Sequence, residues 1–448
     1  MSIYRYTLSD YHAVKDADIT IDGITVLAGE NGSGKSTLSR WLYYLVNGAQ
    51  QFDTLTINEY IDDVSRIMQR HSMAAREMRQ YIPKMALTQS DDFFSKFYPY
   101  ARYSTETSVQ QIQGDFEKFI YSMGSLIKDY IANTKLDKKS ERIFRYLNLG
   151  AYEDANAYEN SMLLVDNYIN DNLKWLSQRT ERLYADLERR PFEQFVENVC
   201  HEYEEKDEIP NNLQLREDDV ELIGVDRVSS LFNLRRAIYI DTPMALTNES
   251  AENVFWNELR SLVVTRSKRK LEMSEKKLLR RVSNILHGEA KMVKDDSPFA
   301  DDELHFVSDD GKLNIEIEKV ATGFKTFIYL QRLLENGCLG DDSLLLIDEP
   351  EAHLHPQWIV EYARLLVLLN RELGQKIMLA THNPDMVAAI RSIAEKEQVL
   401  SKTNFYISEP SGQSNMYCYK ALGTDISEIF TSFNIALDRI HAYGTESL

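Results

Sequence analysis

The chain has 448 residues, of which 43% are hydrophobic and 27% are charged, so it can bury a large core and should divide into more than one structural unit. Its net charge of −19 argues against a protein that coats nucleic acid over most of its surface, because a negative potential repels polyphosphate. No stretch approaches the roughly 18 to 20 apolar residues that cross a bilayer, and the first residues lack a basic region followed by an apolar run, so we expect a cytoplasmic protein without membrane contact.

Residues 1–47 predict a strand, a loop and a helix that together bind phosphate. Polar and apolar side chains alternate up to the apolar strand 24–28, which runs into the glycine-rich turn GENGSGKS at 29–36 and then a helix from near Lys35. The turn fits the P-loop pattern G-x-x-x-x-G-K-[ST], whose backbone N–H groups curl around phosphate oxygens at the positive end of a helix. The predicted nucleotide-binding residues are Asn31, Gly32, Ser33, Gly34, Lys35, Ser36 and Thr37.

Residues 48–235 form long, charge-rich segments with few glycines and with helical spacing. Between residues 158 and 187, apolar side chains recur mostly every three or four positions. A helix of about 30 residues would be about 45 Å long. Because the spacing does not persist over a matched antiparallel partner, we predict a compact helical insertion rather than a long coiled-coil arm.

Residues 236–448 alternate strand-like and helix-like segments, which predicts an α/β domain with a mainly parallel sheet. A run at 266–281 carries eight Lys or Arg. A solvated helix face is the favoured interpretation of this run, and a nucleic-acid contact is the alternative. The expected strands are 237–241, two within 303–320 around a turn at 309–311, 344–347, 376–380, 404–408 and 415–420, and the expected helices are 252–288, 324–336, 357–373 and 425–442.

The apolar segment Leu344 to Ile347 is followed by Asp348, Glu349 and Pro350. A carboxylate at the end of a buried strand can hold Mg²⁺ or its water beside the phosphates, so Asp348 is a candidate metal ligand together with Ser36. Glu349 follows at the position from which a base reaches an attacking water. This pair predicts ATP hydrolysis.

His382 follows the next expected strand, 376–380. It should emerge at the carboxyl edge of the parallel sheet, where ligands bind in open α/β folds. A histidine at this edge can form a hydrogen bond to the γ-phosphate, although a histidine considered alone is more often structural.

Three motifs in the order GENGSGKST, LLLIDEPEAHLHP and ATHNP resemble the ABC-type ATPase heads of SMC proteins, RecF-like repair proteins and OLD-like ATPases. The DEPEAHLHP motif is most similar to the OLD-like ATPases of bacterial defence systems. The resemblance covers roughly residues 1–47 and 237–440, and it implies an ATPase that binds ATP and Mg²⁺ and is at least a dimer, because two heads complete each nucleotide site. It implies these roles: Lys35 on the phosphates, Ser36 and Asp348 on Mg²⁺, Glu349 as general base, and His382 as switch histidine.

The same resemblance requires a signature loop that contacts the γ-phosphate held by the opposite subunit. Residues 321–325, Ala-Thr-Gly-Phe-Lys, occupy that place before an expected helix. Thr322 keeps a hydroxyl and Gly323 allows a close backbone approach, whereas Phe324 and Lys325 depart from the usual Gly and Gln. A Gln-containing loop is also expected after 237–241, where the residues Asp-Thr-Pro at 241–243 offer none.

By resemblance, residues 351–356 lie near the dimer seam, and they include His353 and His355. The H-x-H spacing of these two histidines would otherwise suggest a metal site, but no third ligand is evident nearby. Three cysteines lie far apart and in no metal-ligand spacing, which indicates buried thiols rather than a disulfide framework or a zinc module. They are Cys200, Cys338 and Cys418.

The sequence leaves three functions open. The first is an ATP-driven sensor or switch in anti-phage defence, acting with a separate effector protein, because the roughly 60 residues after His382 are too few for the nuclease domain of OLD nucleases. The second is a RecF-like repair ATPase that binds DNA. The third is a scaffold that uses ATP to assemble and hardly hydrolyses it. A small-molecule phosphotransferase or a transporter is disfavoured.

Overall fold

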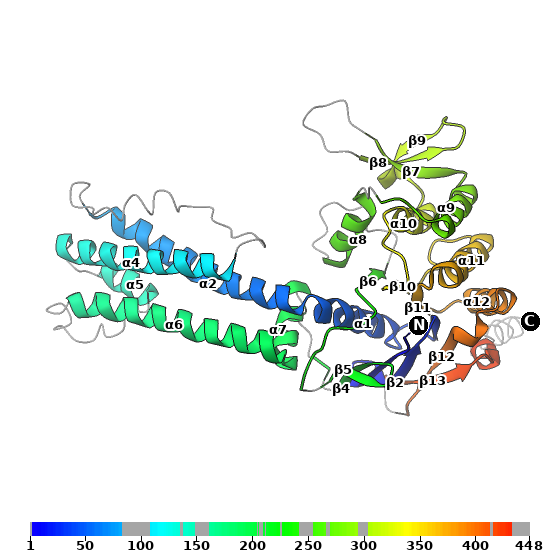
Figure 1. Cartoon of the computed structure of the whole chain (residues 1–448), viewed down its shortest axis with the longest axis horizontal. Coiled ribbons are helices and arrows are strands. Elements are labelled where there is room, and N and C mark those ends of the chain that lie inside the picture. The colour runs from blue at the N-terminus through cyan, green and yellow to red at the C-terminus, as the bar shows by residue number, and fades with distance from the viewer. Residues whose placement is uncertain are drawn as a thin grey trace, which may run out of the picture. The chain divides into compact units, whose positions relative to one another are not determined.

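The computed structural model divides the chain into two compact units, the head (Met1–Gln51 and Pro191–Leu448) and the helical unit (Phe52–Arg190). Figure 1 shows the elements of both units. The residues that the structure describes are 2–82, 108–134, 138–147, 161–203, 205, 209–210, 212–224, 226–241, 254–265, 269–293, 303–412 and 415–431.

The described part of the head contains a ten-stranded sheet in the order β5-β4-β1-β2-β13-β12-β3-β11-β10-β6. The half from β12 to β6 is parallel throughout, whereas the pairs that join β5, β4, β1 and β2 are antiparallel. The strands are β1 (Tyr4–Tyr11), β2 (Val14–Ile21), β3 (Ile24–Ala28), β4 (Asn212–Glu217), β5 (Val220–Ile223), β6 (Arg236–Ile240), β10 (Ser343–Asp348), β11 (Lys376–Thr381), β12 (Thr403–Pro410) and β13 (Tyr417–Gly423).

The parallel and antiparallel halves of the sheet differ in how far their strands are buried. Every residue of β3, β10 and β11 is buried, as expected for parallel strands covered on both faces. The outer strands β1 and β2 instead alternate buried and more exposed residues. The prediction of a mainly parallel α/β sheet with an antiparallel portion and a large helical insertion is therefore confirmed.

Seven described helices belong to the head, and a separate antiparallel sheet of three strands follows α9. Helix α1 packs against β6 and β10, and α10 contacts α8, α9 and β7. The helices are α1 (Lys35–Gln50), α7 (Phe192–Tyr203), α8 (Val254–Val264), α9 (Met273–Leu286), α10 (Thr322–Glu335), α11 (Pro356–Leu373) and α12 (Pro384–Lys396), and the small sheet consists of β7 (Gly288–Val293), β8 (Glu303–Ser308) and β9 (Asn314–Glu316).

The parallel register brings the ends of four strands to one edge of the large sheet. Asp348 of β10 pairs with Ala380 of β11, and Thr381 pairs with Ala28 of β3. Strand β6 ends beside β10, with Ile240 opposite Ile347. The P-loop and the residues after β6, β10 and β11 therefore start from the same edge.

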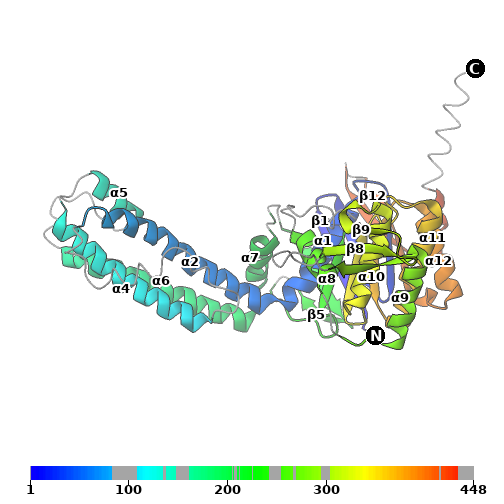
Figure 2. The ribbon, with the colours of Figure 1, turned by 90° about the horizontal axis from the view of Figure 1, so that it is seen from above.

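The helical unit contains α2 (Phe52–Arg79), α4 (Val109–Asn133), α5 (Lys138–Tyr146) and α6 (Ser161–Arg189) among its described residues. The long helices α2, α4 and α6 lie side by side in both Figure 1 and Figure 2 and enclose a hydrophobic core of their own. The helix expected around 158–187 is α6. At the two ends of the unit, the Arg190 guanidinium lies 4.6 Å from the Phe52 ring and donates to Asp53 at 2.7 Å.

Some sequence boundaries differ from the structure. Residues 191–235 were expected in the insertion, but they belong to the head, because β4 pairs with β1 and β5 pairs with β4. The expected helix 252–288 is two helices, α8 and α9, and the helix expected at 425–442 lies outside the described residues beyond 431. All three cysteines are free, and Cys338 is buried. Within the described part of the chain, no helix combines the length and apolar character that crossing a bilayer requires.

Candidate active site

The P-loop connects the buried strand β3 to helix α1. Gly32 and Gly34 have φ values of +82° and +91°, which L side chains rarely adopt. No side chain caps the start of α1 and no acidic residue lies in its first turn, so its N–H groups remain available to an anion. Of the predicted nucleotide-binding residues, Asn31, Gly32 and Ser36 are exposed, Gly34 and Thr37 are half-buried, and Ser33 and Lys35 are buried.

The Lys35 side chain folds back over its own loop. Its Nζ donates to the carbonyl oxygens of Gly29 at 2.9 Å and Glu30 at 2.8 Å. Burial lowers the pKa of Lys35, while the nearby carboxylates of Glu349 and Asp348 act in the opposite direction. The loop thus holds a cation at the start of α1, the position at which a P-loop lysine meets the terminal phosphates.

Asp348 ends β10 and is buried. Its Oδ1 accepts a hydrogen bond from the Ser39 hydroxyl at 2.7 Å, and its Oδ2 accepts one from the Tyr239 hydroxyl at 2.8 Å. Burial raises the pKa of Asp348, and the hydrogen bonds from Ser39, Ser36 and Tyr239 partly oppose that rise. The carboxylate is therefore fixed from both sides in a place where a cation would stabilise its charge.

The residues present fit Mg²⁺. Ser36 acts to lower the pKa of Asp348, so the two groups lie close together, and both offer the hard oxygen ligands that Mg²⁺ prefers. The described residues contain no group of three or more His, Cys, Asp or Glu that could hold a metal. Mg²⁺ usually binds one or two protein oxygens and takes its other ligands from phosphate and water. When bound, Mg²⁺ would neutralise charge on the β- and γ-phosphates.

Glu349 and His382 lie together at the same edge. Glu349 has a φ of +46°, an uncommon value for a non-glycine residue, and its N–H donates to the Ala380 carbonyl at 2.8 Å. Its Oε1 lies 3.5 Å from Nδ1 of His382, and the two side chains are 46% and 42% exposed. The predicted base and the predicted switch histidine are thus neighbours that nucleotide and water can reach.

A third group beside this pair is Glu351, which the sequence analysis placed only near the seam. Its side chain is 4% exposed. Its Oε1 accepts hydrogen bonds from the Thr381 hydroxyl at 2.7 Å and from the backbone N–H of His382 at 3.1 Å. The second glutamate of DEPEAHLHP was the available signal. Its inward direction depends on the neighbouring strand β11, which sequence spacing does not reveal.

The signature residues begin α10. Thr322 is half-buried, and a Cβ added at Gly323 would lie 2.8 Å from the carbonyl oxygen of His353, so a larger residue at Gly323 would collide with backbone. Lys325 points inward, where it is 2% exposed and its Nζ donates to the Glu318 carbonyl at 2.8 Å.

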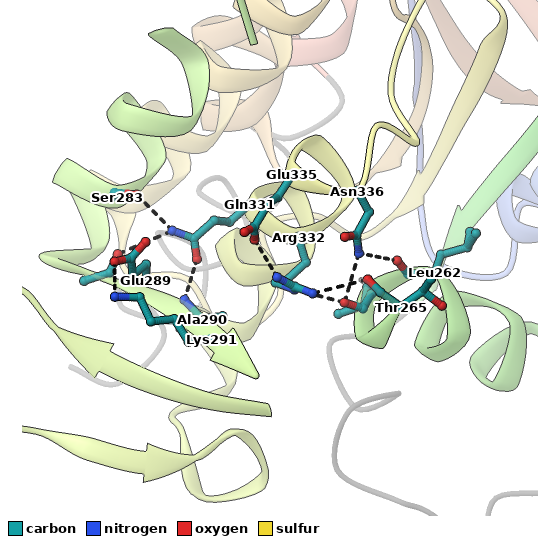
Figure 3. Close-up of polar contacts among 12 residues, drawn as sticks. Leu262, Thr265, Ser283, Glu289, Ala290, Lys291, Gln331, Arg332, Glu335 and Asn336 are labelled. Atoms are coloured by element: carbon teal, nitrogen blue, oxygen red, sulfur yellow. Dashed lines mark hydrogen bonds and ion pairs between the residues drawn. The ribbon is translucent and has the colours of Figure 1, made fainter. Parts of the chain in front are cut away.

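Three side chains near the end of α10 bind backbone groups of other elements, as Figure 3 shows. Gln331 accepts a hydrogen bond from the N–H of Ala290 in β7 at 2.8 Å. Arg332 Nε and Asn336 Nδ2 both donate to the carbonyl of Val263 at the end of α8, at 2.9 Å and 3.2 Å. The Val263 carbonyl lies in the last turn of α8 and lacks a partner within its own helix. Arg332 and Asn336 therefore stabilise the C-terminus of α8.

His353 and His355 are exposed, and His353 has a φ of +65°. His355 caps α11, because its Nδ1 accepts a hydrogen bond from the Gln357 N–H at 3.4 Å. This contact gives His355 a structural role in its own chain. The role of both histidines at a dimer seam stays a prediction.

Other site residues were missed in the sequence. Ser39 lies one helical turn after Lys35, so helical spacing was a usable signal for it. Tyr239 required knowledge that β6 pairs with β10. Asp241, in the place of the missing Gln, is half-buried, and its Oδ1 accepts a hydrogen bond from Trp256 Nε1 at 2.8 Å. Residues 242 and 243 lie outside the described residues.

The chain is similar to SMC head domains among solved structures and to methionine import ATP-binding proteins among curated proteins. The SMC head domain of Pyrococcus furiosus, bound to the C-terminal domain of ScpA, has a TM-score of 0.33 and 14% identity, with 98% of this chain and 100% of that chain covered. The SMC head domain of Thermotoga maritima has a TM-score of 0.24 and 13% identity, with 37% and 51% covered.

Among curated proteins, the methionine import ATP-binding protein MetN of Lactobacillus delbrueckii subsp. bulgaricus is 34% identical over 112 residues, which are 23% of this chain and 30% of that protein. The MetN of Corynebacterium diphtheriae is 39% identical over 83 residues, 18% of this chain and 22% of that protein. The chain thus spans less than a third of the length of these relatives. The profile of the AAA ATPase domain matches residues 1–387. The chain belongs to the AAA ATPase domain family.

Proposed function

We propose that the chain is a Mg²⁺-dependent ATPase that closes as a homodimer around ATP and opens on hydrolysis. The observation that carries the proposal is the meeting of the four required groups at one sheet edge, where Lys35 and Asp348 are buried and Glu349 and His382 are accessible. ATP binding and hydrolysis also agree with the ATPase family to which the chain belongs.

In the proposed reaction a water molecule attacks the γ-phosphorus. Glu349 accepts the proton of this water, the bond between the γ-phosphorus and the bridging oxygen breaks, and ADP and phosphate leave. Lys35 and the uncapped N-terminus of α1 stabilise the charge that builds up on the phosphates. His382 forms a hydrogen bond to the γ-phosphate and so reports its presence.

Dimerisation is proposed because one chain leaves its site open. The Glu349 and His382 side chains are 46% and 42% exposed, and Gly323 of the signature loop packs against the His353 backbone. A second copy would bring its Thr322 and Gly323 to the γ-phosphate. We propose that the helical unit binds a separate effector protein and changes its activity when the dimer closes. The resemblance of DEPEAHLHP to OLD-like ATPases favours a role in bacterial anti-phage defence.

The test replaces Glu349 with Gln and measures ATP turnover and mass in solution, with and without Mg²⁺ and ATP. We expect turnover to fall by at least about 100-fold, as for loss of a catalytic base, and ATP to trap a dimer. Glu395→Gln is the matched control, because Glu395 lies on α12 with 62% of its side chain exposed. If neither turnover nor mass responds to Glu349→Gln, the mechanism is wrong. Slow turnover that the substitution leaves unchanged, with ATP-driven assembly, would favour the scaffold function.

DNA binding is a second candidate function, and helix α9 favours it. Lys276, Lys277 and Arg280 are exposed on one segment of α9, although Lys277 is paired with Glu372 at 3.5 Å. The first residues of the basic run, 266–268, lie outside the described residues. Saturable DNA binding that requires ATP, weakens as salt rises and is lost in the double variant Lys276→Ala, Arg280→Ala would support a repair ATPase.

A further inference from the structure

Glu351 is a buried carboxylate beside Glu349 and His382. With 4% of its side chain exposed, an ionised Glu351 would be costly without partners. Its Oε1 has two hydrogen-bond partners, the Thr381 hydroxyl at 2.7 Å and the backbone N–H of His382 at 3.1 Å. Both partners lie at the end of β11, so Glu351 fixes the backbone from which His382 extends.

Two unsatisfied atoms lie beside this contact. Within the described structure, Oε2 of Glu351 and Nδ1 of His382 are buried and have no hydrogen-bond partner. Nδ1 lies 3.4 Å from Oε1 of Glu351 and 3.5 Å from Oε1 of Glu349. One nitrogen of the His382 imidazole thus lies between two carboxylates. A small rotation of the His382 or the Glu351 side chain would form a hydrogen bond between Nδ1 and Glu351.

Carboxylates in their ionised form only accept hydrogen bonds, so an Nδ1 that pairs with ionised Glu351 carries the proton. This leaves the other ring nitrogen, Nε2, for the nucleotide. A carboxylate behind a functional histidine fixes both the tautomer and the orientation of the ring in this way.

We infer that Glu351 is a positioning residue for ATP hydrolysis, which holds His382 with its Nδ1 protonated and its Nε2 free for the γ-phosphate. This inference rests on the proposed function. A glutamate that merely anchored the loop would need only an oxygen acceptor for the Thr381 hydroxyl and the His382 N–H, and glutamine would serve equally well.

The experiment therefore begins with Glu351→Gln, which has the same shape and keeps an oxygen for both hydrogen bonds. We expect the kcat for ATP to fall on the order of 10- to 100-fold, the loss typical when the partner of a functional histidine is removed, while KM and ATP binding change less than about threefold. The control is Glu395→Gln on α12, where 62% of the glutamate side chain is exposed, and it should leave kcat unchanged. A kcat in Glu351→Gln equal to that of the wild type would overturn the inference.

Dependence on His382 is tested with a double-mutant cycle. If Glu351 acts through His382, then Glu351→Gln in a His382→Asn background should lower kcat no further than His382→Asn alone. Losses that multiply would show an independent role for Glu351 and contradict the inference.

A direct readout is the tautomer of His382 in the wild-type protein, measured by ¹⁵N NMR of histidine-labelled chain and assigned with His382→Asn. We expect Nδ1 to carry the proton, and a neutral ring with the proton only on Nε2 would overturn the inference even if Glu351→Gln does not fold. Glu349→Gln is run in parallel. If it abolishes turnover while Glu351→Gln does not, only the role of Glu351 fails, whereas turnover unaffected by Glu349→Gln removes the proposed function itself.

Discussion

Glu258 illustrates at the scale of one residue how α8 and the P-loop helix are held together. It lies on α8, and its carboxylate accepts a hydrogen bond from the hydroxyl of Tyr43 on α1. Burial raises the pKa of Glu258 from 4.5 to about 7. The Glu258 carboxyl group therefore binds its proton more tightly in the folded protein than in the unfolded chain.

This shift predicts how stability depends on pH. A raised pKa in the folded state adds stability that is fully present below pH 4.5 and is lost as pH rises through about 7, to a total of at most about 3 kcal/mol. Glu258→Gln should remove this slope, which denaturant unfolding between pH 4.5 and 8 would measure. The exposed control Glu395→Gln should leave it unchanged. A variant with the wild-type slope would show that Glu258 does not titrate in this range.

Only some residues of the candidate site could be predicted from the sequence. Lys35, Asp348 and Glu349 were predicted because each stands next to a strand or loop with an unmistakable local pattern. Glu351 and Tyr239 were not, because their contacts with Thr381 and Asp348 join segments that are 30 and 109 residues apart. Such contacts follow from the order of strands in the sheet, which local sequence patterns do not specify.

At the scale of elements, α10 serves both as the carrier of the signature residues and as the support of α8. Asn336 donates to the carbonyl oxygens of Leu262 at 2.7 Å and Val263 at 3.2 Å, just beyond the end of α10. Arg332, which is 3% exposed, shares the second acceptor. The end of α8 is therefore held by the same helix whose start is proposed to meet the partner's nucleotide.

Replacing Asn336 with Ala should lower the free energy of unfolding by about 1 to 2 kcal/mol, because two carbonyl groups at the end of α8 lose a donor. Urea unfolding would measure the loss. Asn284→Ala is the control, since Asn284 is exposed on α9 and should change stability by less than about 0.5 kcal/mol. Equal effects of the two substitutions would show that the contact in Figure 3 adds no stability.

The elements themselves were largely predictable from sequence in the parallel half of the sheet. The buried apolar runs of β3, β10 and β11 and the helix starting at Lys35 have strong local signals, and the structure places them as expected. Strands β4 and β5 were assigned to the helical insertion instead, because they are short and follow a long charge-rich region. Their true place is decided by the pairing of β4 with β1, more than 200 residues earlier, and of β5 with β4.

At the scale of the whole molecule, the chain enters and leaves the helical unit through neighbouring positions. The two ends of that unit meet, since Arg190 contacts both Phe52 and Asp53. In the head, α7 packs against α1, where a Cβ at Gly48 would lie 2.6 Å from the Phe195 ring.

These contacts predict that the head folds without the helical unit. A chain in which a short Gly-Ser linker replaces residues 52–190 should remain folded and bind ATP within about threefold of the full chain, because linkers of this kind close a short gap at little entropic cost. Circular dichroism and nucleotide titration would measure both. A shortened chain that is unfolded or cannot bind ATP would mean that the head depends on the helical unit.

The meeting of the two ends also has an evolutionary consequence. A segment that leaves and returns at adjacent points can be lengthened, shortened or exchanged while the catalytic sheet edge keeps its sequence and its register. Related chains should therefore vary most in the length and surface of the region between Phe52 and Arg190. Natural selection could then change the surface of the helical unit while the residues of the candidate active site stay the same.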